Sequence, residues 1–158
     1  MKLFPTEVGI TELRGIISII RDNGGKISLP QLSNEAEEDI DRLLPLLEAG
    51  SLLGLMKIEG ANVALTEQGK GLNPENMAKI LSNALAKIEP FKTAMKILKE
   101  KGSLTTRDLV RSLRKMRVKI YTDEALDIEA MRKLLLRWGV RSKMFSYDYN
   151  TDTWSLPS

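Results

Sequence analysis

The chain has 158 residues, of which 42% are hydrophobic and 28% are charged, values typical of a globular protein with one domain or two small ones. It contains no cysteine and no histidine, which excludes disulfides, thiolate nucleophiles and thiolate zinc sites and removes the commonest general base. No apolar run approaches the roughly 20 residues of a membrane span, and the start MKLFPTEVG lacks a secretion signal, so we expect a cytoplasmic protein without membrane insertion.

The net charge of +3 is unevenly distributed along the chain. Residues 1–80 carry 8 Lys/Arg against 12 Asp/Glu, a net charge of −4, whereas residues 81–158 carry 16 against 9, a net charge of +7. This asymmetry favours an anionic partner for the second half. Ordinary lysine-rich helix surfaces would produce the same composition.

The first half predicts three helices. Asn23-Gly24-Gly25 ends the first, because glycine tolerates the left-handed conformation at a helix end. Ser28 with Gln31 forms a capping box for a short second helix. Pro45 requires the third helix either to begin near Arg42 or to bend. The apolar stripes at helical spacing are Ile10, Leu13, Ile16, Ile17 and Ile20 in the first helix, and Ile40, Leu43, Leu44 and Leu47 in the third.

The stretch LMKIEGANVALTEQGKGL, residues 55–72, predicts a hairpin and a joint. Met56 and Ile58 alternate with polar residues, and Val63 and Leu65 return on the same face. Thr66 is placed to cap the segment after the hairpin, and the glycines of the joint would allow close packing. Three helices followed by a hairpin is the order of a winged helix, a variant of the helix-turn-helix.

The second half repeats this order. Asn73-Pro74 predicts the start of a connecting helix, which Glu89-Pro90 ends. A further helix then ends at Gly102, and Thr105 with Asp108 caps the next. A third helix is expected to stop at Gly139, before a hairpin of alternating aromatic residues. The apolar stripe of that third helix is Ile128, Met131, Leu134, Leu135 and Trp138, and the hairpin carries Phe145, Tyr147, Tyr149 and Trp154.

The predicted fold is therefore mainly α with small β-wings, in the form of two winged-helix units joined by a helix. We place an acidic first unit at residues 1–72, the linker helix at 73–89 and a basic second unit at 90–158. Gly50 and Gly54 in the first unit, and Gly139 in the second, occupy corresponding positions between the third helix and its hairpin.

Three stretches carry a resemblance to a known family. These are LRGIISIIRDNGG, then DIDRLLPLLEAGSLLGLMKIEGANVALTEQGKGL, and finally LLLRWGVRSKMFSYDYNTDTWSL. Over residues 9–156 the chain resembles the C-terminal AAA-associated domain, which follows the ATPase of ABC transporters of the nitrate, sulfonate and taurine type and also occurs alone. The resemblance implies a docking or regulatory role and assigns no catalytic residues or cofactors.

The chain lacks the phosphate-binding loop of those ATPases. No G-x-x-x-x-G-K-[ST] occurs, and Gly69-Lys70-Gly71 lacks both the preceding glycine and the following hydroxyl. We find no nucleophile paired with a base, and we expect a protein that is not an enzyme and that needs no cofactor.

A basic cluster in the second unit is the candidate interaction surface. Arg107, Arg111 and Arg114 follow i, i+4, i+7 spacing, which places them on one helix face. Guanidinium groups bind phosphate oxygens, so the cluster suits DNA, but it suits an acidic protein surface or plain solvation equally well. The full candidate set is Arg107, Arg111, Arg114, Lys115, Arg117, Lys119, Arg132, Lys133 and Arg137.

The remaining polar and aromatic clusters have more ordinary interpretations. The carboxylates of Glu37, Glu38, Asp39 and Asp41 suit a helix N-terminus and would repel phosphates, which argues against DNA binding by the first unit. Metal binding there is the lesser alternative. Aromatic residues at period two in a hairpin favour cross-strand packing over base stacking.

The prediction is a non-enzymatic interaction module that docks on, or regulates, an ABC-type ATPase. The alternative is a DNA-binding transcriptional regulator that uses the basic second winged helix. A homodimer stays open.

Overall fold

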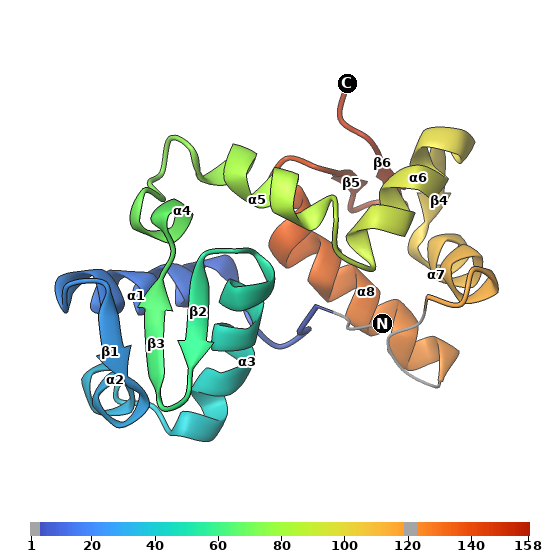
Figure 1. Ribbon diagram of the computed structural model, residues 1–158. Coiled ribbons are helices and arrows are strands. Elements are labelled where there is room, and N and C mark those ends of the chain that lie inside the picture. The colour runs from blue at the N-terminus through green and yellow to red at the C-terminus, as the bar shows by residue number, and fades with distance from the viewer. Residues whose placement is uncertain (1–3, 119–122) are drawn as a thin grey trace. The chain divides into compact units, whose positions relative to one another are not determined.

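The computed structural model describes residues 4–118 and 123–158, and the chain divides into two compact units. The N-terminal unit is Glu7–Pro74, and the C-terminal unit combines Met1–Thr6 with Glu75–Ser158. The part of the chain that the structure describes is mainly helical and contains two small three-stranded antiparallel sheets (Figure 1). The sequence predicted the helical class and the hairpin of each sheet, but it did not predict the third strand, at Lys26–Ser28 in one sheet and Ser103–Thr105 in the other. None of its helices is long and apolar enough to cross a membrane.

The N-terminal unit has one strand between its first two helices and a hairpin after its third. Its elements are α1 (Ile10–Asp22), β1 (Lys26–Ser28), α2 (Leu29–Ala36), α3 (Ile40–Leu52), β2 (Met56–Glu59), β3 (Asn62–Leu65) and α4 (Glu67–Lys70).

Local signals set the first two helices of this unit. All five apolar residues of the predicted α1 stripe are buried, and Gly24 and Gly25 follow the helix with φ of 83° and 92°. The Ser28 hydroxyl accepts a hydrogen bond from the Gln31 backbone N–H at 3.2 Å and so caps α2. The glycine stop and the Ser28 cap are confirmed. The Gln31 side chain does not complete the predicted capping box by these bonds, since its Nε2 donates to Asn23 Oδ1 and Glu35 Oε2 at 3.0 Å and 2.8 Å.

Helix α3 begins at Ile40 and contains Pro45 in its interior, which excludes the alternative of a start near Arg42. Leu43 and Leu47 of the predicted stripe are buried, but Ile40 and Leu44 are 36% and 43% exposed. The buried face passes instead through Leu46, one turn before Gly50, because the core side of α3 is rotated away from Ile40 and Leu44.

The hairpin and the joint form as predicted. Strand β3 is central in the order β1-β3-β2, and Val63 lies opposite both Ile27 and Ile58. The Thr66 hydroxyl accepts from the Gly69 N–H at 3.1 Å and donates to the Gly54 carbonyl at 2.6 Å. A Cβ at Gly69 would overlap the Leu55 carbonyl, so this position requires glycine.

The C-terminal unit contains one additional helix before the same order of elements. They are α5 (Met77–Leu85), α6 (Phe91–Lys101), β4 (Ser103–Thr105), α7 (Thr106–Lys115), α8 (Glu124–Leu134), the π-helix η1 (Leu135–Val140), β5 (Ser146–Asp148) and β6 (Thr153–Ser155).

The helix after the joint begins later and ends earlier than predicted. Pro74, Glu75 and Asn76 form a turn, α5 begins only at Met77, and it ends at Leu85, before Glu89-Pro90 is reached. Helix α6 follows Pro90, and its first turn is capped by the Glu89 carboxylate, which accepts from the Thr93 backbone N–H at 3.0 Å and from its hydroxyl at 2.6 Å.

Aromatic rings fill the core of the C-terminal unit. Phe4 packs edge-to-face on Trp138 and Phe91, with ring centroids 4.8 Å and 5.7 Å apart. Trp154 on β6 lies opposite Tyr147 on β5 and Leu104 on β4. Phe145 and Tyr147 therefore pack across strands on Trp154, as predicted. Tyr149 does not, since it is 75% exposed and its ring contacts Tyr147 on its own side of the hairpin.

Gly139 was predicted to end its helix, and this prediction was wrong. The chain continues as η1 to Val140, and Lys143, with φ of 63°, makes the turn into the hairpin. Gly139 is instead a close-approach position, since a Cβ there would overlap the Phe145 ring. Gly50 is also inside its helix, and a Cβ there would lie 2.6 Å from Met56 Cε.

Candidate interaction surface

Helix α7 presents the basic residues that the sequence placed on one face. Its apolar face is buried through Leu109, Val110 and Leu113, while Arg107 and Arg111 are exposed on the other side. Thr105 caps the helix by accepting from the Asp108 N–H at 3.2 Å, which confirms the predicted start.

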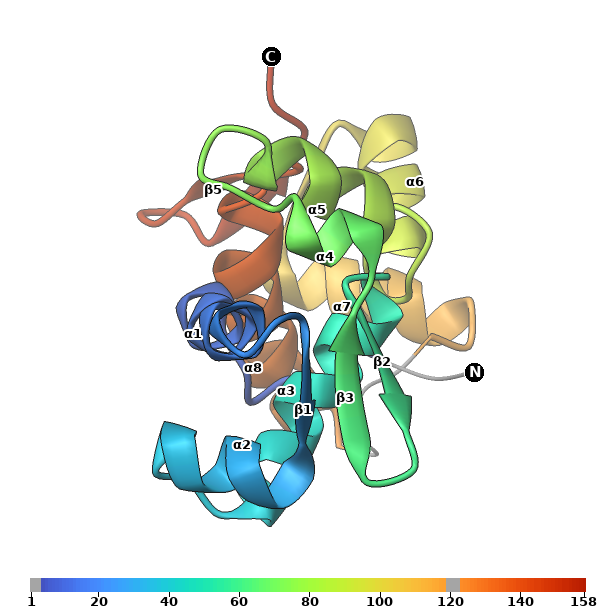
Figure 2. The same ribbon diagram turned by 60° about the vertical axis from the view of Figure 1, so that its left-hand side comes forward.

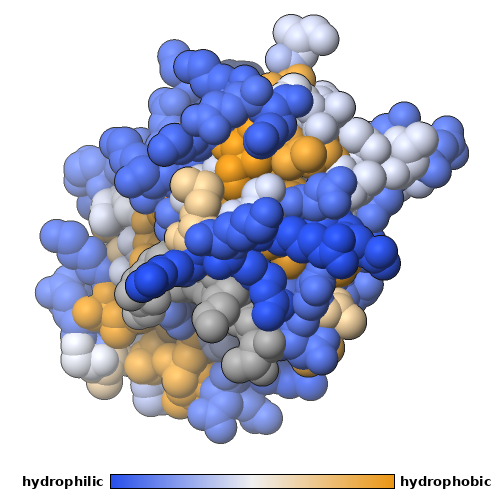
Figure 3. Space-filling model, turned by 90° about the vertical axis from the view of Figure 1, so that its right-hand side faces the viewer, coloured by the Kyte–Doolittle hydropathy of each residue, from blue (hydrophilic) through white to orange (hydrophobic). Residues whose placement is uncertain are grey.

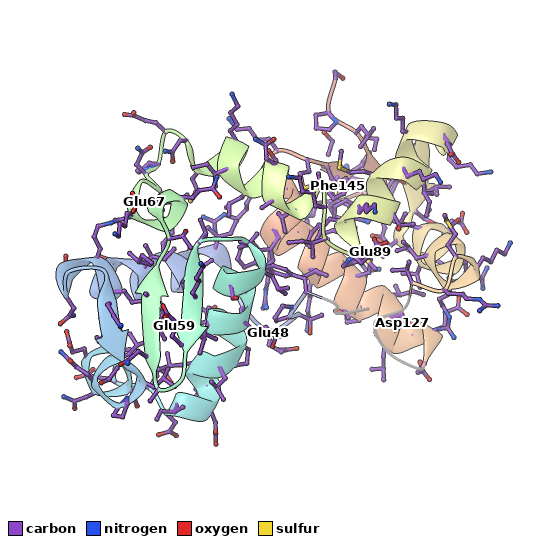
Figure 4. The ribbon with its side chains drawn as sticks, in the orientation of Figure 1. Glu48, Glu59, Glu67, Glu89, Asp127 and Phe145 are labelled. Atoms are coloured by element: carbon purple, nitrogen blue, oxygen red, sulfur yellow. The ribbon has the colours of Figure 1, made fainter. Side chains whose placement is uncertain are left out.

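Two of the α7 arginines form ion pairs with α8. Arg111 Nε lies 2.7 Å from Glu124 Oε1, and Arg114 Nη1 lies 3.0 Å from Asp127 Oδ2. The Asp127 side chain is only 2% exposed, and Figure 4 shows Asp127 on the first turns of α8. The Arg114 pair therefore holds α7 against α8, and a partner would have to compete with it.

Arg132 also forms ion pairs with acidic residues of its own unit. Its Nε and Nη2 contact the two carboxylate oxygens of Asp152 at 3.1 Å and 2.8 Å, and its Nη1 contacts Glu129 at 3.0 Å. The fork on Asp152 is bidentate, the strongest geometry for this pair. Arg132 thus fastens α8 to the hairpin.

Asp152 is the centre of a network that the sequence did not reveal. Its carboxylate accepts from the Thr106 hydroxyl at 2.6 Å and from the Tyr147 hydroxyl, in addition to Arg132. The buried Trp154 Nε1 donates to the Thr106 hydroxyl at 2.8 Å, and the Thr106 N–H donates to the Asp152 carbonyl at 3.1 Å. We call these five residues the hairpin network.

The hairpin network shifts the ionisation of its members. Hydrogen bonds from Arg132 and, less strongly, from Thr106 and Tyr147 hold the pKa of Asp152 well below its usual range, although burial opposes them. Asp152 in turn raises the pKa of Arg132 by accepting its hydrogen bonds. Burial, and then the bond to Asp152, raises the pKa of Tyr147. All three stay in their ordinary charge states near neutral pH.

The other candidate cations differ in accessibility. Arg137 Nη1 donates to the Thr6 carbonyl at 3.2 Å. Among the described residues, no ion-pair partner faces Arg107, Lys115, Arg117 or Lys133, and all four are exposed. Lys119 lies outside the described residues. Figure 3 shows this side of the molecule, where hydrophilic side chains form a continuous band between apolar patches.

The N-terminal unit presents a different kind of surface. On α3, Ile40 and Leu44 are exposed one turn apart, and the exposed Asp41 lies beside them. The carboxylates of Glu37, Glu38 and Asp39 precede the helix, and residues 4–118 and 123–158 contain no group of three acidic residues positioned to hold a metal ion. The combination of apolar and acidic side chains suits a protein partner better than a phosphate backbone.

The fold and the exposed side chains of the two units agree with a protein that acts through its surface. Two helical units each carry a three-stranded sheet, and their described surfaces offer exposed charged and apolar side chains. The chain belongs to the C-terminal AAA-associated domain family, whose model matches residues 30–148, most of the chain. No curated protein and no solved structure matches it significantly.

Proposed function

We propose that the chain is a non-enzymatic interaction module that docks on an ABC-type ATPase and regulates it. Family membership over residues 30–148 is the observation that carries this proposal, because the family is associated with ATPases. Each unit, in this proposal, is a winged helix, since a helix, a strand, two helices and a hairpin follow one another in both.

The surface of α3 supports a protein partner over DNA for the N-terminal unit. In a winged helix this third helix would enter the major groove. Here it exposes Ile40 and Leu44, which cannot bind phosphates, next to Asp41, which repels them. Exposed apolar residues rimmed by charge are typical of protein interfaces.

The test first locates an ABC transporter whose ATPase gene lies beside the gene for this chain, and then measures binding of the chain to that ATPase. We expect a complex by isothermal titration calorimetry and a changed rate of ATP hydrolysis when the full chain is added. Leu44→Glu should weaken binding about 10-fold or more, because a carboxylate would replace an apolar contact. Ile58→Glu is the matched control, since Ile58 is 42% exposed on the hairpin and Leu44 is 43% exposed on α3.

Two outcomes would count against the proposal. If the ATPase neither binds the chain nor changes its rate, docking is excluded for that ATPase. If Ile58→Glu weakens binding as much as Leu44→Glu does, α3 is not the docking helix.

A second candidate, DNA binding by the C-terminal unit, is supported by four exposed cations. Arg107, Lys115, Arg117 and Lys133 have no ion-pair partner among the described residues, whereas Arg111 and Arg114 have one each and Arg132 has two. If all four of these cations contacted phosphates, log K would fall with log salt at a slope of about −3.6.

Fluorescence anisotropy with random-sequence duplex DNA tests this candidate. Reversing Arg107, Lys115 and Lys133 to glutamate should abolish binding without disturbing the pairs that hold α7 to α8. Absence of binding at low salt, or binding that is insensitive to salt, would eliminate the DNA candidate.

A further inference from the structure

The N-terminal unit contains a groove between its three main helices. Its volume is about 720 Å³, and it lies where α1, α2 and α3 converge. Figure 2 shows α1 nearly end-on with α2 below it. The apolar part of its lining consists of Val8, Ile16, Ile19, Ala36, Leu43, Pro45 and Leu46.

The rim of the groove is strongly acidic. Exposed carboxylates come from all three helices and from the segment before α1, and one guanidinium, that of Arg42, lies among them. Arg42 Nη1 is 3.8 Å from Glu38 Oε2, so a partner of the opposite charge already faces it. The five rim carboxylates are Glu7, Glu12, Glu35, Glu38 and Asp41, which with Arg42 give the groove a net charge of −4.

We infer that this groove binds a cationic amphipathic helix of a protein partner. The inference rests on the proposed function in taking the ligand to be a protein segment, and it specifies the chemistry of that segment. Apolar side chains at i, i+3/i+4 and i+7 would enter between Ile19 and Leu46, as in other helix-in-groove complexes. Lysines or arginines beside them would reach the rim carboxylates with their flexible stems over the apolar lining.

Charge complementarity selects this occupant. Phosphates and acidic peptides would meet five carboxylates and are repelled. A neutral apolar helix would contact the lining but would form no ion pairs with the rim carboxylates. A helix with one apolar stripe and flanking cations satisfies both the lining and the rim.

The probe is a synthetic leucine-lysine peptide of about 14 residues, roughly four helical turns, with leucines at i, i+3, i+4 and i+7. Fluorescence anisotropy with the full chain should show saturable binding that weakens as salt is added. The same peptide with glutamate in place of lysine should not bind. Equal binding of the two peptides would overturn the inference.

Reversing the rim tests the location. The triple variant Glu12→Lys, Glu38→Lys, Asp41→Lys should reduce the affinity for the leucine-lysine peptide about 10- to 100-fold. The matched control reverses Asp22, Glu59 and Glu67, three exposed carboxylates of the same unit outside the groove. Figure 4 shows Glu59 at the hairpin and Glu67 at α4. If the control loses as much affinity, the peptide binds by net charge alone.

Filling the groove tests the apolar part. Gly15 of α1 lines the groove, and a Cβ there meets no atom within 4 Å. Gly15→Leu should weaken peptide binding about 10-fold by occupying the space, with an unchanged circular dichroism spectrum. Gly15→Ala makes the same change of helix propensity with a smaller side chain and should bind like the wild type. Wild-type affinity in Gly15→Leu would overturn a groove-bound peptide.

The two proposals fail separately. If the ATPase binds the rim-reversed chain as tightly as the wild type, docking stands and the groove is not its site. If no ATPase binds but the peptide still distinguishes the rim variant from its control, the groove stands and the ATPase proposal fails.

Discussion

The two units make the same backbone turn from the third helix into the hairpin, but with different side chains. In the N-terminal unit the Leu55 N–H donates to the Gly50 carbonyl at 2.9 Å, and in the C-terminal unit the Met144 N–H donates to that of Gly139 at the same distance. Six residues after each glycine comes the side chain that packs against it. That side chain is Met56 in one unit and Phe145 in the other.

The hairpins differ more strongly. In the N-terminal unit the Leu29 N–H donates to the Ala61 carbonyl, and in the C-terminal unit the Thr106 N–H donates to the Asp152 carbonyl in the same way. The cross-strand pair Ile58–Val63 of the first hairpin likewise corresponds to Tyr147–Trp154 of the second. The positions of the hairpin network are therefore apolar in the N-terminal unit. One backbone arrangement tolerates either an apolar or a hydrogen-bonded hairpin, so the backbone pattern constrains the fold more tightly than the chemistry of these side chains does.

The largest effect should come from filling the two glycine positions. Gly139→Ala should destabilise the C-terminal unit by about 3 kcal/mol, because the buried Phe145 ring cannot move aside. Gly50→Ala should cost about 1 kcal/mol, because the obstructing atom is the end of the flexible Met56 side chain.

Urea unfolding measures both variants. The only two tryptophans, Trp138 and Trp154, lie in the C-terminal unit, so fluorescence follows that unit, while far-UV circular dichroism follows the whole chain. If Gly139→Ala and Gly50→Ala lower the free energy of unfolding equally, Met56 and Phe145 are equally confined. The two turns from third helix to hairpin would then not differ in this respect.

The next effect concerns the hairpin network. Asp152→Ala should destabilise the C-terminal unit by about 2–3 kcal/mol, because Arg132, Thr106 and Tyr147 lose their shared acceptor. The reciprocal change, Ala61→Asp, places a carboxylate at the exposed equivalent position and should cost less than about 0.5 kcal/mol. If Asp152→Ala leaves the unfolding midpoint measured by tryptophan fluorescence unchanged, the hairpin network does not stabilise the C-terminal unit.

Acid should affect the two hairpins differently. The folded pKa of Asp152 lies below the unfolded value of about 3.9, so its stabilisation is complete above that pH and is lost as the pH falls below it. Between pH ~5 and ~3 the urea midpoint of the C-terminal unit should therefore fall more steeply in the wild type than in Asp152→Asn. Parallel slopes would contradict the assignment of this acid sensitivity to Asp152.

The sequence predicted the features that depend on near neighbours. The α1 stripe, the Ser28 and Thr105 caps and the twofold order of elements are local patterns, and all appear in the structure. Asp152 gave no such signal, because its partner Thr106 is 46 residues away in the chain. Only folding brings them together.

The candidate surface was predictable in composition but not in accessibility. Arg107, Arg111 and Arg114 share a face as their spacing indicated, yet Arg111 and Arg114 pair with acids on α8. Whether a cation is paired depends on how α7 packs on α8, and helical spacing carries no information about that contact. The groove was missed for the same reason, since its rim combines carboxylates from separate helices.

The smallest effect concerns the residue that turns the chain into each hairpin. Gly54 and Lys143 both have left-handed backbones, with φ of 75° and 63°, and each lies four residues after its packed glycine. Lysine has a steric cost there that glycine avoids, but glycine is more flexible in the unfolded chain. Lys143→Gly should therefore stabilise the C-terminal unit by only about 0.5 kcal/mol, whereas Gly54→Ala should destabilise the N-terminal unit by about 1 kcal/mol. Thermal unfolding of the full chain by circular dichroism and by tryptophan fluorescence separates the two, and a loss of stability in Lys143→Gly would mean that the lysine side chain makes a stabilising contact that outweighs its backbone strain.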